Sequence, residues 1–382
     1  MESIRSKFFN GIDGGDKKIT WIKWTKVLAA KKNGGLGVSS FYALNRALLF
    51  RWVWRFISQE DSLWFRLVHA IHGNNINRIQ AANVSPWVSI LREVHSLKAR
   101  GIDLVSHCKK RVGDGLNTCF WEDTWMGDQP FKLMFSRIYA LESNKLCMVA
   151  EKCHPNALDQ MFRQSIRGDV ESQQYTQLHD LIGALILSNT TDRWVWDLNG
   201  SGDFMVKDVR SMIDDFMLPK EPDVTRWIKC IPIKLNVFAW KVRHDRLETK
   251  SNLILRGISL DSPTCLVCSL TNKDVSHILF CCDLASLVSR RVCRWGNLDW
   301  QQVSSYTEWL SWLKSIRMGA KLKSILEGVF YISWWHVWNF RNQLIFADIK
   351  PRRIVIFDDI VARSFTWCSS RYNKKFSWEN WI

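Results

Sequence analysis

Apolar residues recur at intervals of three and four through much of the chain, which is the pattern of helices that bury one face. One case, over 41–57, follows Ser39 and Ser40, either of which can cap the first turn. Ser85-Pro86 opens the clearest helix, because a capping serine and a proline at the first helical position are a typical start, and Gly101 ends it. These spacings predict a mainly helical chain.

Further helices are expected in both halves of the sequence. A short one follows Asp61-Ser62, whereas 131–190 has a weaker helical pattern. A helix over 234–247 is followed by one that Thr249 can cap. From about Trp300 onward the helical patterns become rich in aromatic residues.

Two stretches predict β-hairpins. Val112–Leu116 and Phe120-Trp121 are interpreted as short strands around a turn. Alternating bulky residues over 194–198 run into Asn-Gly-Ser-Gly, and apolar residues resume over 204–206. A further glycine cluster, Gly34-Gly35-Leu36-Gly37, predicts a flexible turn. The expected fold class is therefore α+β, mainly α with short β-hairpins.

Charge and aromatic content point to a class of partner. The 382 residues include 53 Lys and Arg against 37 Asp and Glu, a formal net charge of +16, together with 22 Trp. A strongly basic, aromatic-rich chain favours a polyanionic partner, nucleic acid first. The helical spacing of the tryptophans predicts that roughly four in five are buried rather than available for stacking on bases.

The sequence favours an intracellular protein. The most apolar window, Gly328–Phe340, covers 13 residues and is closed by Glu327 and Arg341, so it is too short for a membrane span. The N-terminus has no apolar signal core. Eleven cysteines are an odd number, which argues for reduced thiols rather than a disulfide framework. We expect no membrane partner and a location in the nucleus or the cytoplasm.

A cluster of metal-ligand residue types stands in the C-terminal half. Cys265, Cys268, His277 and Cys282 have the spacing C-x2-C-x8-H-x4-C, in which two pairs can supply opposite edges of a tetrahedral zinc site. From spacing alone, the neighbouring Cys281 is an equal candidate for the last ligand. Four protein ligands close a site against water, so we expect one structural Zn²⁺. Helical segments would then surround a small zinc-binding module.

These residues and their surroundings resemble a known family. The segments are Thr225-Arg-Trp-Ile-Lys-Cys-Ile-Pro232, Lys234-Leu-Asn-Val-Phe238-Ala-Trp240, Arg246-Leu-Glu-Thr249, Cys265-Leu-Val-Cys268 and His277-Ile-Leu-Phe-Cys-Cys282. Together they are similar to the reverse-transcriptase zinc-binding domain of plant non-LTR, LINE-type retrotransposons. The resemblance implies Cys282 rather than Cys281 as the fourth ligand. Asp283 departs from the family, in which proline usually follows the last cysteine.

Segments on both sides resemble the same polyproteins in the expected order. They are Trp21-Ile-Lys-Trp24, Lys32-Asn-Gly-Gly-Leu-Gly37, Val112-Gly-Asp-Gly115, Phe120-Trp-Glu-Asp-Thr-Trp125, Trp196–Phe204 and Trp338-Asn-Phe-Arg-Asn342. The resemblance implies a chain from the C-terminal part of an RNA-directed DNA polymerase, with the polymerase part of a parent polyprotein as a possible partner.

The expected organisation has four parts. They are a thumb-like, post-polymerase helical segment (1–75), a connecting region with a helix and two hairpins (76–220), the zinc-binding domain (221–300) and a tryptophan-rich helical segment (301–382).

Polymerase catalysis is not expected from this chain by itself. A reverse transcriptase needs an aromatic-x-Asp-Asp hairpin and a further aspartate to hold two Mg²⁺ ions. Asp214-Asp215 lacks the aromatic residue and is interpreted as a solvated helix end. Asp358-Asp359 has its aromatic residue one place too late and follows the cysteine cluster, where the family has no catalytic hairpin. No catalytic residue is therefore assigned.

Candidate phosphate contacts are the basic residues near the N-terminus and beside the cysteine cluster. They are Lys17, Lys18, Lys23, Lys26, Lys31, Lys32, Arg46, Arg51, Arg55, Lys234, Lys241, Arg243 and Arg246. Taken singly, each is more simply explained as part of a solvated helix face.

The first functional hypothesis is a zinc-stabilised module, without a catalytic palm, that binds template RNA or target DNA. The alternative is an inert or protein-interaction module of transposon origin, in which zinc only stabilises the fold. A residual polymerase is a third hypothesis and is expected to be inactive.

Overall fold

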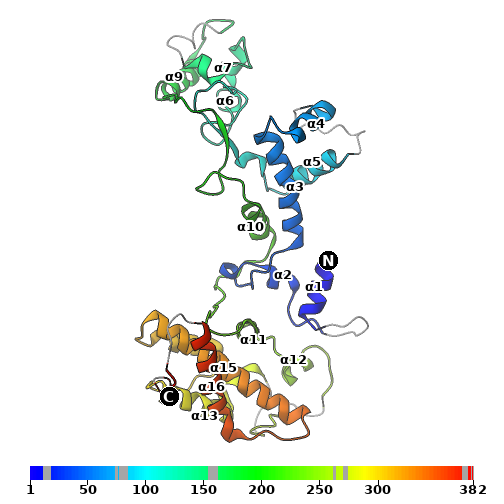
Figure 1. Ribbon diagram of the computed structural model, residues 1–382, viewed down its shortest axis with the longest axis vertical. Helices are drawn as coiled ribbons and strands as arrows, with labels where there is room; N and C mark the ends of the chain where they lie inside the picture. Colours follow the sequence, from blue (N-terminus) through cyan, green and yellow to red (C-terminus); the bar gives the residue numbers. More distant parts are fainter. Residues whose placement is uncertain are drawn as a thin grey trace. The chain divides into compact units, whose positions relative to one another are not determined.

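The computed structural model describes residues 1–11, 19–73, 76, 85–153, 162–260, 264–269, 274–371, 377–379 and 381. The chain forms two compact units (Figure 1): unit 1 combines Met1–Val38 with Pro219–Ile382, and unit 2 is Ser39–Leu218. The expected segment 1–75 thus contributes to both units. The border between Leu218 and Pro219 lies in the proline-bearing stretch that precedes the cysteine cluster.

Unit 2 is a set of helices with one small sheet. Its elements are α3 (Phe41–Ser58), α4 (Leu63–His72), α5 (Pro86–Ala99), η2 (Val105–His107), β1 (Cys108–Arg111), α6 (Phe131–Met134), α7 (Ser136–Leu141), α8 (Val149–Lys152), α9 (Asp169–Gly183), β2 (Arg193–Trp196) and α10 (Val206–Met217). Helix α3 packs against α4, α5 and α10, and their apolar faces form one core. A second core lies among α6, α7, α8 and α9.

The predicted helix starts in unit 2 are confirmed by side-chain caps. The hydroxyl of Ser40 accepts from the Ala43 N–H at 3.0 Å, and that of Ser85 accepts from the Val88 N–H at 3.2 Å. Ser62 caps α4 in the same way. Each cap satisfies an amide at the end of a helix that has no partner within the helix.

The mainly α fold class is confirmed, but the two local hairpins are wrong. Strand β1 pairs antiparallel with β2, more than eighty residues later, in the register Cys108 to Trp196 and Arg111 to Arg193. Residues 204–206 do not return as a strand, because α10 begins at Val206. The bulky alternation of β2 instead places Trp196 in the core of unit 2.

The Gly-Asp-Gly segment wraps a carboxylate instead of forming a strand. The N–H groups of Gly113 and Gly115 donate to Asp192 at 2.6 and 2.9 Å, and the hydroxyl of Thr118 donates at 2.7 Å. A Cβ on Gly113 would lie 2.0 Å from the carbonyl oxygen of Thr190, so only glycine fits there. The Asn117 N–H donates to the same carboxylate at 3.0 Å, so four donors fix this loop.

The regular elements among the described residues of unit 1 are all helical. Its elements are α1 (Glu2–Phe9), α2 (Trp24–Leu28), η1 (Lys31–Asn33), α11 (Ile233–Arg243), α12 (Lys250–Ile254), the π-helical turn η4 (His277–Cys281), α13 (Asp283–Trp295), α14 (Tyr306–Ser315), α15 (Ala320–Phe346), η5 (Arg353–Val355) and α16 (Ile356–Arg371). Helix α15 contacts α11, α13 and α16 (Figure 1), and its middle is buried on all sides. This explains why Gly328–Phe340 is apolar without spanning a membrane. No described helix is long and apolar enough to cross a bilayer.

The glycine cluster of the N-terminal segment is a packed turn, so the expectation of flexibility is wrong. Gly34 has φ 81°, and its carbonyl accepts from the Trp240 indole N–H at 2.8 Å. The hydroxyl of Thr225 donates to the Gly35 carbonyl at 2.6 Å, and a Cβ on Gly35 would lie 2.0 Å from the Ala29 carbonyl oxygen. These contacts attach the first segment of the chain to α11 within unit 1.

The tryptophans are less buried than predicted. Seven of the 22 are buried, thirteen are partly exposed and two, Trp52 and Trp378, are exposed. Trp52 lies on the exposed side of α3. Its ring packs on that of Trp64, with 4.8 Å between the ring centres, rather than in the core. Large amphipathic rings of this kind commonly keep one edge in water.

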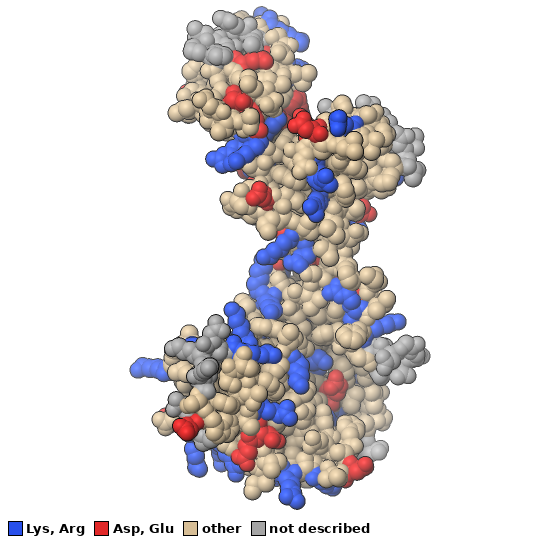
Figure 2. Space-filling model, viewed as in Figure 1, with Lys and Arg blue, Asp and Glu red and all other residues tan. Residues whose placement is uncertain are grey.

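Net charge is divided very unequally. Unit 1 contains 33 Lys and Arg against 17 Asp and Glu, whereas unit 2 contains 20 of each. The entire formal charge of +16 therefore belongs to unit 1. On the visible face of that unit, basic side chains are widely spread, with fewer acidic ones between them (Figure 2).

Candidate metal centre

The first two candidate ligands lie on a tight turn. Cys265 and Cys268 flank it, and the Ser269 N–H donates to the Cys265 carbonyl at 2.7 Å, with Ser269 in the left-handed region at φ 62°. The guanidinium of Arg353 donates to the Val267 carbonyl at 2.8 Å. This bond ties the turn to the segment that leads into α16.

The second pair is brought together by a π-helical turn. His277 begins η4 and Cys282 follows its end, and the Cys282 N–H donates to the His277 carbonyl at 2.7 Å. In an α-helix, residues five apart lie about 140° from one another around the axis. The wider π turn closes that gap, so that both side chains face the same point. The carboxylate of Asp274 accepts from the His277 backbone N–H at 2.5 Å and fixes the start of the turn.

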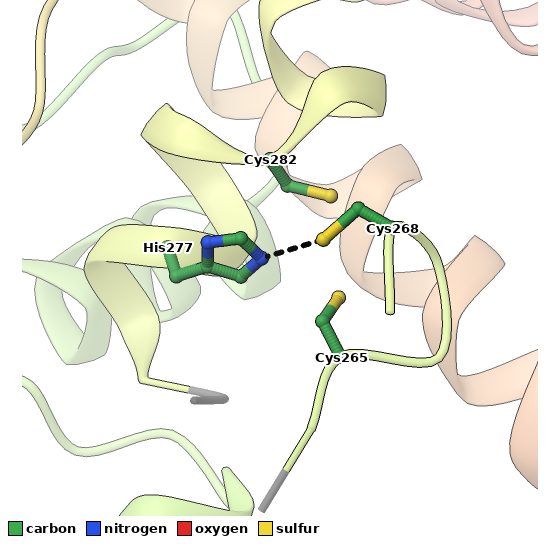
Figure 3. Close-up of side chains that lie close together, drawn as sticks. All are labelled: Cys265, Cys268, His277 and Cys282. Carbon is green, nitrogen blue, oxygen red and sulfur yellow. Dashed lines mark hydrogen bonds between the residues drawn. The ribbon is translucent and has the colours of Figure 1, made fainter. Parts of the chain in front are cut away.

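All four predicted side chains meet at this point (Figure 3). Their donor atoms lie within 4.8 Å of one another, and the Cys268 sulfur is 3.3 Å from His277 Nε2. A tetrahedral zinc site with bonds of about 2.3 Å has edges of about 3.8 Å, so the donors need to move by less than about an ångström. Three sulfurs and an imidazole also match the donor preference of zinc. Among the described residues, this is the group of metal-ligand side chains that could hold an ion.

The electrostatics of the four-donor group favour the thiolate form of Cys265. The hydrogen bond from the Cys282 thiol lowers the pKa of Cys265 to about 4, although burial opposes this shift. The same contact and burial raise the pKa of Cys282. Arg341 of α15 is buried, and this burial lowers the pKa of its guanidinium. The charges of Glu248 and Cys265 raise that pKa and so partly offset the effect of burial.

Cys281 does not join the group. Its side chain is exposed, and its thiol lies 3.6 Å from the carbonyl oxygen of Ser304. Partial burial of its sulfur, with the nearby charges of Asp274 and Glu308, raises the pKa of this thiol, so it stays protonated near neutral pH. The structure therefore separates two cysteines that spacing alone left equivalent.

The basic candidates are scattered rather than gathered into one site. Lys17 and Lys18 lie outside the described residues. In unit 2, Arg46 pairs with Glu93 at 2.9 Å, while Arg51 and Arg55 line a shallow cavity of about 530 Å³.

In unit 1, several candidates are already engaged. Lys26 pairs with Glu221 at 2.5 Å, the Lys31 ammonium lies 3.6 Å from the ring centre of Trp227, and Arg243 donates to the Val224 carbonyl at 3.0 Å. Lys241 is partly exposed, whereas Lys23, Lys32, Lys234 and Arg246 are exposed.

The two aspartate pairs occupy different environments. Asp358 and Asp359 are exposed in the first turn of α16. Asp214 is half-buried in α10 and accepts from the Ser40 hydroxyl at 2.6 Å, so its interpretation as a solvated helix end is wrong. Burial raises the pKa of its carboxyl group. Asp214 thus joins α10 to the first turn of α3 within unit 2.

Unit 1 also contains a groove that no sequence motif indicated. It has a volume of about 710 Å³ and lies between the extended segment 223–228, α14 and the first turns of α15. Lys314 and Lys323 line it, and both belong to the stretch 314–323, which has four basic residues and no acidic one. This basic stretch is visible in the sequence, but its position opposite the distant segment 223–228, which makes the groove, is not.

Comparison with known proteins supports a zinc-binding family for the segment that contains the cysteine cluster. The family described as zinc-binding in reverse transcriptase matches residues 206–288. A putative ribonuclease H protein of Arabidopsis thaliana is 24% identical over 372 residues, which cover 91% of this chain and 56% of that protein. An uncharacterized mitochondrial protein of the same plant is 30% identical over 134 residues, covering 34% of this chain and 82% of that protein. No solved structure matches.

Proposed function

Because the chain belongs to a plant retrotransposon-derived family that carries the reverse-transcriptase zinc-binding domain, we propose that it is a zinc-stabilised, nucleic-acid-binding part of a LINE-type RNA-directed DNA polymerase. The proposal assigns it one structural Zn²⁺ and no polymerisation by itself. Its partner would be template RNA or target DNA, beside the polymerase part of a longer protein.

One observation carries the proposal: the four-donor group and the whole net charge of +16 lie in the same unit. A zinc ion bound by Cys265, Cys268, His277 and Cys282 would join the turn before η4 to the start of α13. Its chemistry there is that of a crosslink, because four protein ligands leave no position for water. The lysines and arginines of unit 1 would bind phosphates and release counterions.

The test combines metal content with binding on a salt gradient. The purified chain is expected to contain one zinc per molecule and to bind RNA or DNA with an affinity that falls steeply between about 50 and 200 mM salt. A flat salt dependence would contradict the nucleic-acid role. Zinc content without measurable nucleic-acid affinity would instead support the alternative, an inert or protein-interaction module.

The enzymatic part of the proposal has a separate test. Primer extension on an RNA template is expected to stay at background. Extension above background that is lost in Asp358→Ala would overturn the assignment, because it would make the exposed aspartates of α16 functional.

A further inference from the structure

The groove between α14 and α15 has the composition of a phosphate-binding surface at its edge. Lys314 comes from the last turn of α14 and Lys323 from the first turns of α15, and both line the groove. The Lys323 ammonium donates to the Lys314 carbonyl at 3.1 Å, which places this charge beside the end of α14. Two ammonium groups from different helices therefore converge on one space.

The acidic groups of the groove are already neutralised. Glu327 is buried and accepts two hydrogen bonds from the Arg226 guanidinium, both 2.5 Å, and one from the Tyr331 hydroxyl at 2.7 Å. The carboxylate of Asp223 lies 3.3 Å from the guanidinium of Arg243. Four cationic side chains thus line the groove with two carboxylates, and the cations left over are the two lysines.

The rest of the lining suits a base rather than a bare anion. Leu310 and Tyr306 lie one turn apart on the groove side of α14, and Val224 and Ile228 lie opposite on the extended segment. The uncharged lining mixes these apolar and aromatic side chains with the hydroxyl groups of Thr225, Thr307 and Ser324. The volume of about 710 Å³ is within the usual range of small-ligand sites. A base inside a duplex cannot enter such a space, whereas an unpaired nucleotide can.

We propose that this groove binds a nucleoside phosphate unit, with its phosphate at Lys314 and Lys323 and its base against Leu310 and Tyr306. The inference rests on the proposed nucleic-acid function and deepens it, because it names the surface and an unpaired strand as the preferred form. A free nucleotide has the same chemistry, so the experiment must separate the two sources.

The experiment uses the full, zinc-loaded chain and fluorescence anisotropy with a labelled 12-nucleotide strand. The variant is Lys314→Ala with Lys323→Ala. The matched control is Lys350→Ala with Arg352→Ala, which removes the same charge from exposed positions in the same unit, outside the groove. Thermal unfolding by circular dichroism verifies that both proteins are folded.

The groove variant is expected to lose at least about tenfold in affinity for the strand, and the salt slope is expected to fall by about 1.4, since each phosphate contact to a single strand contributes about 0.7. The control is expected to stay near the parent in both. If the groove variant binds the strand like the parent, or if variant and control lose the same affinity, the groove proposal is wrong while the proposed function stands. If the parent protein does not bind the strand, both the groove proposal and the proposed function are wrong.

Two further arms identify the ligand. In the first arm, ATP and the unlabelled strand each compete with the labelled strand for the parent protein. If ATP competes only at a much higher nucleotide concentration than the unlabelled strand, the ligand is a strand. If both compete equally per nucleotide, the ligand is a free nucleotide in the same groove. Leu310→Ala is expected to weaken binding of the ordinary strand and to leave an abasic strand of equal length unchanged. Equal weakening of both strands overturns the base contact.

Discussion

At the scale of single residues, position matters more than residue type. Cys281 and Cys282 are chemically identical neighbours, yet only the second faces Cys265, Cys268 and His277. Asp192 and Asp359 are both aspartates, but the first accepts hydrogen bonds from a loop and the second is exposed. Substituting each member of such a pair in turn therefore shows which of the two the fold requires.

The four candidate ligands of the proposed zinc ion give the first prediction. Cys265→Ser or Cys282→Ser should release the metal, because each removes one of four ligands. Cys281→Ser is the matched control and should retain one zinc per chain. Metal content measured with a chromogenic chelator after gel filtration checks this. Unchanged zinc in both ligand variants would refute the ligand set.

Asp192 gives the second prediction. Burial alone would raise the pKa of its carboxyl group, but hydrogen bonds from Gly113, Thr118 and Gly115 outweigh burial, so the pKa lies below its ordinary value of 3.8. The carboxylate therefore stabilises unit 2 above about pH 4, and this stabilisation disappears as pH falls through the lowered folded-state pKa.

Asp192→Asn is accordingly expected to lower the free energy of unfolding at pH 7 by about 2–3 kcal/mol, through loss of charge-assisted hydrogen bonds. Denaturant melts at pH 7 and pH 3 measure the difference, which should shrink in acid. A difference that grows in acid would contradict the assigned role. Asp203→Asn, at an exposed position of the same unit, is the control.

At the scale of elements, the short glycine-rich turn near the N-terminus matters for the packing of unit 1. The segment from Ala29 to Gly37 returns on itself through the bond from the Gly37 N–H to the Ala29 carbonyl, 2.8 Å. Gly35 passes so close to Ala29 that no side chain fits, and Trp240 of α11 closes the turn from outside. The turn is therefore part of the packing of unit 1.

Gly35→Ala gives the third prediction. The added methyl group would overlap a backbone carbonyl that cannot move alone, so the substitution should cost at least about 2 kcal/mol, as overpacking does. In a unit of this size that corresponds to a fall of roughly 4–8 °C in Tm. Gly183→Ala is the control, because a Cβ there meets nothing within 4 Å. Equal Tm values for the two variants would contradict the close approach.

Elements with local signals were predictable from the sequence, and elements made by distant partners were not. The caps at Ser40, Ser62 and Ser85 involve neighbours three residues away, so the helix starts follow from the sequence. Strand β1 pairs with a strand far along the chain, and no local pattern shows that partner. The metal-ligand spacing was visible for the same local reason, whereas the groove of Lys314 and Lys323 was not.

At the scale of the whole molecule, the two units differ in charge and in their metal-ligand side chains, because the four-donor group found among the described residues lies in unit 1. Unit 2 has no net charge and two apolar cores of its own. Unit 1 contains the four-donor group, whose Cys265 and Cys282 belong to its core. Loss of a bound ion would leave three sulfurs and an imidazole crowded in that core without a shared partner.

Metal removal gives the fourth prediction. Chelation should unfold the region 225–300, because metal binding and folding are coupled in sites of this kind. Amide hydrogen exchange followed by mass spectrometry should show faster exchange there, while β1, β2 and α3 keep their protection. Faster exchange throughout unit 2 would show that its fold also depends on the metal. Readdition of zinc is the control for reversibility.

The division of unit 1 into two stretches of sequence also constrains the order in which the units can fold during synthesis. Residues 1–38 leave the ribosome before the 180 residues of unit 2, and only then does Pro219 begin the remainder of their unit. At about 5–20 residues per second the first stretch waits roughly 10–35 seconds for α11. During that time its apolar side chains, Ile22, Val27 and Leu36, lack the Trp240 against which they pack in the finished protein. Unit 2, an unbroken stretch, can fold during this interval, so it can be complete before residues 1–38 meet the rest of their unit.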